Sequence, residues 1–310
     1  MNAIAELRSS AQPQSSQQKQ FEQLEVRFDA DYGVMWHFMT PKGRPVFNLE
    51  LLAELRGFHR EIEERNGLAF NDGTDDRINY LVLGSKAPGV YNLGGDLNLF
   101  RDAITKRDRE RLLFYGRKCI DNVYPWSRNL DLPLTTMALV EGDALGGGFE
   151  CALSASVLVA EESARMGFPE VLFNLFPGMG AYSFLSRKVG RRITDELITG
   201  GNIYTARQLY DMGVVDVLAP DGCGEQAVYS FIKKHAKAAN GRRAIETVRR
   251  EVEPVTREEL ARVVEIWADA ALRLTERDLR MMERLVRAQS KNAELELVSS
   301  SNVTPLRQTA

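Results

Sequence analysis

Cysteine and histidine are scarce in this sequence of 310 residues, which contains three of each. The cysteines show no CxxC spacing and cannot build a disulfide framework, so they favour a reducing compartment. The histidines show neither HExxH nor paired-ligand spacing. We therefore expect no metal site, and we expect each histidine to be an ordinary surface or core residue.

Long apolar runs are also missing. The most apolar stretch, residues 145–160, is too short to cross a bilayer and carries Glu150. The first 20 residues are polar and lack the apolar core of a signal peptide. A formal net charge of −3 and a pI near 5.8 provide no basic field for nucleic acid or anionic membranes. These absences disfavour secreted, membrane-bound and nucleic-acid-binding proteins and predict a cytoplasmic one.

The common nucleotide and nucleophile motifs are absent as well. The glycine-rich runs are not followed by GK[ST], as a P-loop requires, and the dinucleotide pattern GxGxxG does not occur. No GxSxG elbow is present to carry a serine nucleophile. The sequence therefore gives no indication of a bound nucleotide cofactor, and its chemistry has to come from other residues.

What the chain does contain is an alternation of strand-like and helix-like segments. Apolar and polar residues alternate on both sides of a turn within residues 24–38, which predicts a β-hairpin. Helical spacing covers residues 47–65, and short apolar runs of strand type lie at 80–83, 134–140 and 157–160. Strands that alternate with helices predict an α/β core.

Helix-capping and helix-breaking residues indicate where several later elements begin and end. Helices are expected at 181–189 and 191–199, separated by a glycine. Thr205 is expected to cap a short helix that a strand follows at 214–218. Thr256, with a glutamate three residues later, predicts a capping box at the start of a further helix.

Changes in composition divide the chain into four parts. Residues 1–20 are rich in serine and glutamine and are expected to form a disordered arm. Residues 21–223 contain the α/β core, and residues 224–290 have a helical pattern throughout. Residues 291–310 are again polar and are expected to form a disordered tail.

Two glycine-rich turns follow expected strands. The first is NLGGDL at residues 92–97, and the second is ALGGGFE at residues 144–150. Glycines let the backbone approach a ligand closely, and amides at such turns point at anions or developing oxyanions. Taken alone, a glycine pair after a strand is more often a plain turn.

Two glutamates accompany these turns. Glu150 ends the second turn and precedes an apolar helix, and Glu170 follows Pro169 in the run GFPE. A poorly solvated carboxyl group has a raised pKa, which suits it to proton transfer near neutral pH. The alternative is that each glutamate only stabilises a helix N-terminus through the helix dipole.

Taken together, the two turns, both glutamates and their order resemble the crotonase (enoyl-CoA hydratase/isomerase) superfamily. The longer runs NLGGDLNLF, ALVEGDALGGGFECAL and GFPEVLFNLFPGMGAYSFL, with EIWADAALRL near the C-terminus, are similar to the diffusible-signal-factor synthases of the RpfF type. The resemblance spans residues 20–290. Tyr91 departs from the family pattern, which has phenylalanine at that position.

The resemblance implies a fold and an assembly. The fold is a crotonase-type spiral of ββα units with a C-terminal helical trimerisation region, in an α/β protein. The assembly is a homotrimer or a dimer of trimers. In signal-synthase systems a regulatory sensor protein often holds the enzyme inactive, so such a partner is also expected.

The resemblance also implies an activity and its residues. A 3-hydroxyacyl chain on acyl carrier protein is dehydrated to a cis-2-enoyl thioester, which is then hydrolysed to a free fatty-acid signal. Glu150 and Glu170 match the two catalytic carboxylates, and Gly95 and Gly147 match the two oxyanion-hole amides. No metal or organic cofactor is required.

Further residues are expected to contact the substrate. These are Gly94, Leu145, Gly146, Met179 and Trp267. The tryptophan is equally well explained as a core residue at a helix or trimer interface. Two other functions share the motifs: an enoyl-CoA hydratase of fatty-acid breakdown, and a regulatory binding protein of the same fold without catalysis.

Overall fold

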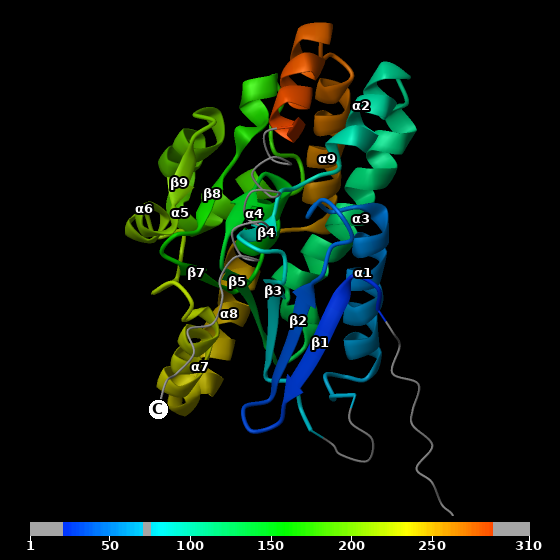
Figure 1. Cartoon of the computed structure of the whole chain (residues 1–310). Helices are drawn as coiled ribbons and strands as arrows, with labels where there is room; N and C mark the ends of the chain where they lie inside the picture. The colour runs from blue at the N-terminus through cyan, green and yellow to red at the C-terminus, as the bar shows by residue number, and fades with distance from the viewer. Residues whose placement is uncertain (1–20, 71–75, 288–310) are drawn as a thin grey trace, which may run out of the picture.

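The computed structural model describes residues 21–70 and 76–287 (Figure 1). The expected arm at 1–20 and the expected tail at 291–310 lie outside the described residues. The described chain forms two β-sheets, of six and four strands, surrounded by helices. None of the described helices combines the length and the apolar character that crossing a lipid bilayer requires.

The larger sheet contains the N-terminal hairpin. Its strands, in spatial order, are β1 (Leu24–Asp29), β2 (Val34–Met39), β3 (Tyr80–Ser85), β5 (Thr135–Val140), β7 (Val157–Glu161) and β10 (Val217–Ala219). β1 and β2 pair antiparallel, as the predicted hairpin requires, and every other pairing in this sheet is parallel. The final strand is shorter than the expected 214–218, because the backbone of Val214 instead donates to Leu209 in the turn after a helix.

Three of the four strands of the smaller sheet each follow a strand of the larger one. Its order is β4 (Val90–Asn92), β6 (Asp143–Leu145), β8 (Arg165–Gly167) and β9 (Ile203–Thr205). The chain thus passes from β3 to β4, from β5 to β6 and from β7 to β8, and a helical segment follows each pair. This is the expected spiral of ββα units, and it brings the three strand ends next to one another.

The helices begin and end at residues with clear local causes. They are α1 (Leu49–Glu64), α2 (Leu97–Thr105), α3 (Arg109–Ser127), α4 (Gly147–Leu153), α5 (Ala181–Thr199), α6 (Ala206–Asp211), α7 (Gly224–His235), α8 (Ala239–Val252) and α9 (Arg257–Ala271), and residues 276–287 are also helical. The Asn48 side chain caps α1, and Asn66 and Gly67, both with positive φ, follow the C-terminal end of this helix. Gly190, with φ of 76°, breaks α5 at the expected point between two helical segments.

The predicted capping box at α9 is only half formed. The Thr256 side chain accepts from the backbone N–H of Glu259, as expected. The Glu259 carboxylate does not return the bond, because it pairs with both terminal nitrogens of Arg187. A complete capping box does occur at α6, between Thr205 and Gln208.

The larger sheet is covered on both faces. One face supports the main core, which it shares with α1, α3 and α4. The other face packs Trp36, Phe38 and neighbouring strand residues against Val228 and Ile232 of α7. Helix α9 lies along α3, at the end of the molecule where α2 is also found (Figure 1).

Candidate active site

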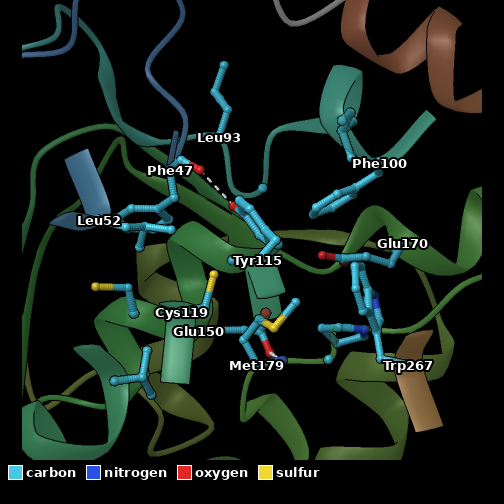
Figure 2. A pocket seen from close by; sticks show the side chains of 18 of the residues that line it. Phe47, Leu52, Leu93, Phe100, Tyr115, Cys119, Glu150, Glu170, Met179 and Trp267 are labelled. Atoms are coloured by element: carbon cyan, nitrogen blue, oxygen red, sulfur yellow. Dashed lines mark hydrogen bonds between the residues drawn. The ribbon is translucent and has the colours of Figure 1, made fainter. Parts of the chain in front are cut away.

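A mostly apolar cavity lies between α1, α3, α4 and the segment before α5. Its empty volume is about 980 Å³, which includes open solvent at its mouth. Apolar side chains line it from several elements, among them Leu52 and Leu55 of α1, Phe100 of α2 and Val123 of α3. Both candidate glutamates and both candidate oxyanion-hole glycines line this cavity, and Figure 2 shows the side chains of the two glutamates.

The two glycine turns pack backbone against backbone. Gly94 has a φ of +94°, and a Cβ there would lie 2.7 Å from the Leu145 carbonyl oxygen and 2.9 Å from the Gly147 nitrogen. A side chain at Gly94 is therefore excluded by both the backbone angle and the space. This close approach joins the ends of β4 and β6, which pair in the smaller sheet.

Two backbone amides are left free by this packing. Within the described part of the chain, neither the Gly95 nor the Gly147 N–H donates a hydrogen bond. The two sites adjoin, since a Cβ on Gly147 would lie 3.4 Å from the Gly95 nitrogen. Paired N–H groups in an apolar cavity are the arrangement that stabilises a developing oxyanion.

Glu150 stands in the first turn of α4 and is 2% exposed. Its Oε1 accepts hydrogen bonds from the backbone N–H of Met179 at 2.7 Å and of Ala181 at 3.0 Å. Burial raises the pKa of the carboxyl group to about 7, and the backbone N–H groups oppose the rise by stabilising the charged form. Near neutral pH this group can therefore both accept and release a proton.

Glu170 lies in the short 3₁₀ helix Pro169–Phe173. Its Oε2 is buried and has no hydrogen-bond partner in the described chain, while Oε1 lies against Gly146, where a Cβ would collide with it. Burial and the charge of Glu150 raise the pKa of Glu170 to about 8. An unpartnered carboxyl oxygen of this kind is available to a ligand.

The two carboxyl groups form one acid–base unit. Each resists ionisation because it is buried, and the charge on one makes ionisation of the other harder. Between their pKa values the pair holds one proton and one negative charge. Such a pair supplies an acid and a base to the same ligand at neutral pH.

The structure separates the other expected contact residues into two groups. Met179, Trp267 and Gly146 line the cavity. Gly94 and Leu145 are not among its lining residues. The Leu145 side chain packs instead with Val46, Val90 and Leu93. The backbones of Gly94 and Leu145 contact each other where the two glycine turns meet. Trp267 is both buried and cavity-lining, with its ring edge-on to Phe100 at 5.0 Å.

Tyr115 of α3 positions the first glycine turn and was not singled out by the sequence. Its hydroxyl donates to the Phe47 carbonyl oxygen at 2.7 Å, which Figure 2 marks, and accepts from the Asp96 N–H at 3.3 Å. These bonds hold the residue after Gly95. A tyrosine within an amphipathic helix has no local pattern that distinguishes this role from core packing.

A model of the enoyl-CoA hydratase/isomerase family matches residues 58–284. The human mitochondrial methylglutaconyl-CoA hydratase is 28% identical over 142 residues, which are 46% of this chain and 40% of that protein. The probable enoyl-CoA hydratase 2 of Arabidopsis thaliana is 29% identical over 182 residues, 59% of this chain and 55% of the relative. The chain thus spans about half the length of these curated relatives.

Two solved structures show the same fold at low identity. Pseudomonas aeruginosa DspI is 22% identical, with a TM-score of 0.64 over 77% of this chain and 92% of its own. An enoyl-CoA hydratase/isomerase from Xanthobacter autotrophicus Py2 is 18% identical, with a TM-score of 0.69 over 89% of this chain and 97% of its own. Both likenesses concern the arrangement of the elements.

Proposed function

This chain belongs to the enoyl-CoA hydratase/isomerase family, and we propose that it synthesises a cis-2-unsaturated fatty-acid signal. Its substrate is a 3-hydroxyacyl chain on acyl carrier protein, which it dehydrates and then releases by hydrolysis of the thioester. The observation that carries this proposal is that Glu150, which is buried, and Glu170, which is half-buried with a buried carboxyl oxygen, line the same apolar cavity as two free glycine amides. The long motifs shared with diffusible-signal-factor synthases point to the signal as product.

The dehydration uses all four groups. The Gly95 and Gly147 N–H groups donate to the thioester oxygen and stabilise the enolate that forms when the Cα proton leaves. One carboxyl group of the Glu150–Glu170 pair takes that proton, and the other protonates the departing 3-hydroxyl group. Water leaves, a double bond forms between the second and third carbons, and the pair again holds one proton.

The hydrolysis reuses the same site. A carboxylate of the pair accepts a proton from water, whose oxygen attacks the thioester carbon. The two amides then hold the oxyanion of the tetrahedral intermediate, and the thiol of the carrier departs with a proton. The apolar walls around Met179 and Trp267 suit the fatty chain.

The test is one incubation of purified protein with 3-hydroxydodecanoyl carrier protein, followed by mass spectrometry of the thioester and the free acid. Free cis-2-dodecenoic acid is the expected product, and Glu150→Gln and Glu170→Gln variants are expected to form none. Release of the free 3-hydroxy acid alone would overturn the dehydration step. Full product formation by either variant would overturn the assigned roles of the glutamates.

An enoyl-CoA hydratase is the second candidate, because the names of the curated relatives describe such enzymes. The two glutamates serve hydration as well as dehydration. Rapid hydration of crotonyl-CoA, with the carrier-bound substrate left intact, would favour it. Inactivity on both substrates would favour a regulatory binding protein of the same fold.

We also propose that the protein acts as a homotrimer or dimer of trimers and binds a regulatory sensor protein. Exposed apolar side chains on α8 are consistent with an interface, namely Ile245, Val248 and Val252. Light scattering measures the oligomer. Capture of the sensor with the Glu150→Gln variant separates binding from catalysis.

A further inference from the structure

The cavity has a polar end that the proposed reaction does not use. His59 of α1 and Asn122 and Trp126 of α3 line it, and each is at least nine-tenths buried. Each also has one buried polar atom without a hydrogen-bond partner in the described chain: His59 Nδ1, Asn122 Oδ1 and Trp126 Nε1. Unsatisfied buried polar atoms are costly, so three of them along one cavity wall indicate a missing partner.

Along α3, this polar end is far from the first glycine turn. Tyr115 stands beside Gly95, and the cavity wall continues along α3 through Cys119 and Asn122 to Trp126. At about 1.5 Å per residue, Tyr115 and Trp126 are roughly 16 Å apart along the helix. A chain whose thioester oxygen meets the glycine amides would therefore reach the polar end with its far carbons.

The geometry sets the donor and acceptor roles. Both hydrogens of the Asn122 amide are used, since Nδ2 donates to the carbonyls of Leu52 and Lys118, each at 3.0 Å. Reversing the amide would place its oxygen against two carbonyls, so Oδ1 is the free acceptor. Trp126 Nε1 can only donate. Asn122 and Trp126 are four residues apart on one helix face and are therefore neighbours.

The histidine completes the polar end without adding charge. His59 Nε2 lies 3.3 Å from His37 Nε2, and the His59 ring stacks on Trp126 with 5.3 Å between centroids. Burial, together with His37 and Arg56, lowers the pKa of His59 well below its ordinary value, so the ring is neutral. Arg56 is engaged by Glu63 through two bonds of 2.9 Å. The polar end thus suits a neutral group better than a carboxylate.

We propose that this end of the cavity binds a hydroxyl group near the far end of the acyl chain. The hydroxyl oxygen accepts from the Trp126 N–H, and the hydroxyl hydrogen goes to Asn122 Oδ1. A carbonyl group cannot match this pair, because it has no hydrogen for Asn122. The inference rests on the proposed function for the position of the chain, and it names the substrate class as a terminally hydroxylated fatty acyl thioester.

The test measures binding alone. Acyl-pantetheine amides carry nitrogen in place of the thioester sulfur and do not turn over. We would titrate plain and ω- or (ω−1)-hydroxylated decanoyl, dodecanoyl and tetradecanoyl amides calorimetrically. At the chain length that fits, the hydroxylated ligand is expected to bind about tenfold more tightly, the usual effect of pairing one buried polar group.

Two variants and a control isolate the polar end. Trp126→Phe removes the N–H and keeps an aromatic ring. Asn122→Leu keeps the branched side-chain shape and removes the acceptor together with the two N–H groups that bond to Leu52 and Lys118. Each is expected to abolish the tenfold preference, measured within that variant as the ratio of the dissociation constants of the plain and the hydroxylated ligand. Trp36→Phe is the control, because the Trp36 N–H bonds to the Tyr229 hydroxyl at 3.1 Å, away from the cavity. This variant is expected to keep the preference.

The outcomes separate this inference from the reaction. Equal or weaker binding of hydroxylated ligands at every chain length would overturn it, and so would a preference that survives in both variants. Absence of binding by any acyl ligand would overturn the acyl assignment of the cavity as well. A hydroxyl preference in a protein without dehydratase activity would support the inference while refuting the proposed function.

Discussion

Replacing Glu170 with glutamine should make the protein more stable at alkaline pH and inactive. The carboxyl group is raised to a pKa of about 8 from an ordinary 4.5, because it is buried near Glu150. Below pH 4.5 it is protonated in both the folded and the unfolded chain and does not affect the stability difference. As pH rises toward 8, the unfolded chain loses the proton and the folded chain keeps it, so the free energy of unfolding falls.

The magnitude follows from that shift. A rise from 4.5 to about 8 corresponds to about 5 kcal/mol, at ~1.4 kcal/mol per pKa unit, once the folded protein must ionise the group. Water that enters the cavity mouth screens part of this cost, so we expect about 2–4 kcal/mol. Glutamine has nearly the same shape and never ionises. The increase in the free energy of unfolding caused by Glu170→Gln should therefore be near zero at pH 4 and largest above pH 8.

The assay is urea unfolding of both proteins from pH 4.5 to 9, with thermal unfolding as a second probe. Glu64→Gln is the matched control, because Glu64 is exposed at the end of α1. The reasoning fails if Glu170→Gln is no more stable than the native protein at pH 8.5. It also fails if the difference does not grow with pH.

Three further outcomes are expected. The rate should peak between about pH 7 and 8, where the Glu150–Glu170 pair holds one proton, and fall on both sides; a flat pH–rate profile would contradict the acid–base pair. Gly146→Ala should lower kcat by about 100-fold, because the added methyl group would displace the Glu170 carboxyl group and because residue 146 has a φ of +52°, which is unfavourable for alanine. An unchanged kcat would show that the position of this carboxyl group is not critical. Ala181→Pro removes one N–H donor to Glu150, at the first residue of a helix, where proline is tolerated. The loss raises the pKa of Glu150, so the acidic limb of the pH–rate profile should move to higher pH. An unshifted limb in a folded variant would refute the contribution of that hydrogen bond.

The two glutamates and the two oxyanion-hole glycines could be predicted from the sequence because each lies in a short motif of a few adjacent residues. Glycine pairs and a glutamate before an apolar helix have few physical explanations, and the strand that precedes each run places it at a sheet edge. The sequence did not show that the amides of Gly95 and Gly147 adjoin. That depends on β4 pairing with β6, and each of these strands has only three residues. So short a strand has no measurable periodicity, and residues 143–145 were expected to belong to a turn.

The polar end of the cavity was beyond the reach of the sequence for a different reason. His59, Asn122 and Trp126 lie on two helices that are distant in the chain, and in each helix they occupy the buried face. A histidine among leucines is normally a core residue whose nitrogens are satisfied. Only the three-dimensional accounting of donors and acceptors shows that three polar atoms lack partners.

Met179 joins two parts of the site that are usually considered separately. Its side chain lines the cavity, and its backbone N–H donates to the Glu150 carboxylate at 2.7 Å (Figure 2). A chain too bulky to fit must push on this wall, and any displacement of the Met179 backbone lengthens the bond to the carboxylate. Poor fit then disturbs the proton-transfer geometry as well as the contact area. Among the proposed acyl substrates, a poorly fitting chain should therefore have a lower kcat, and a wrong chain that binds tightly should still be a slow substrate.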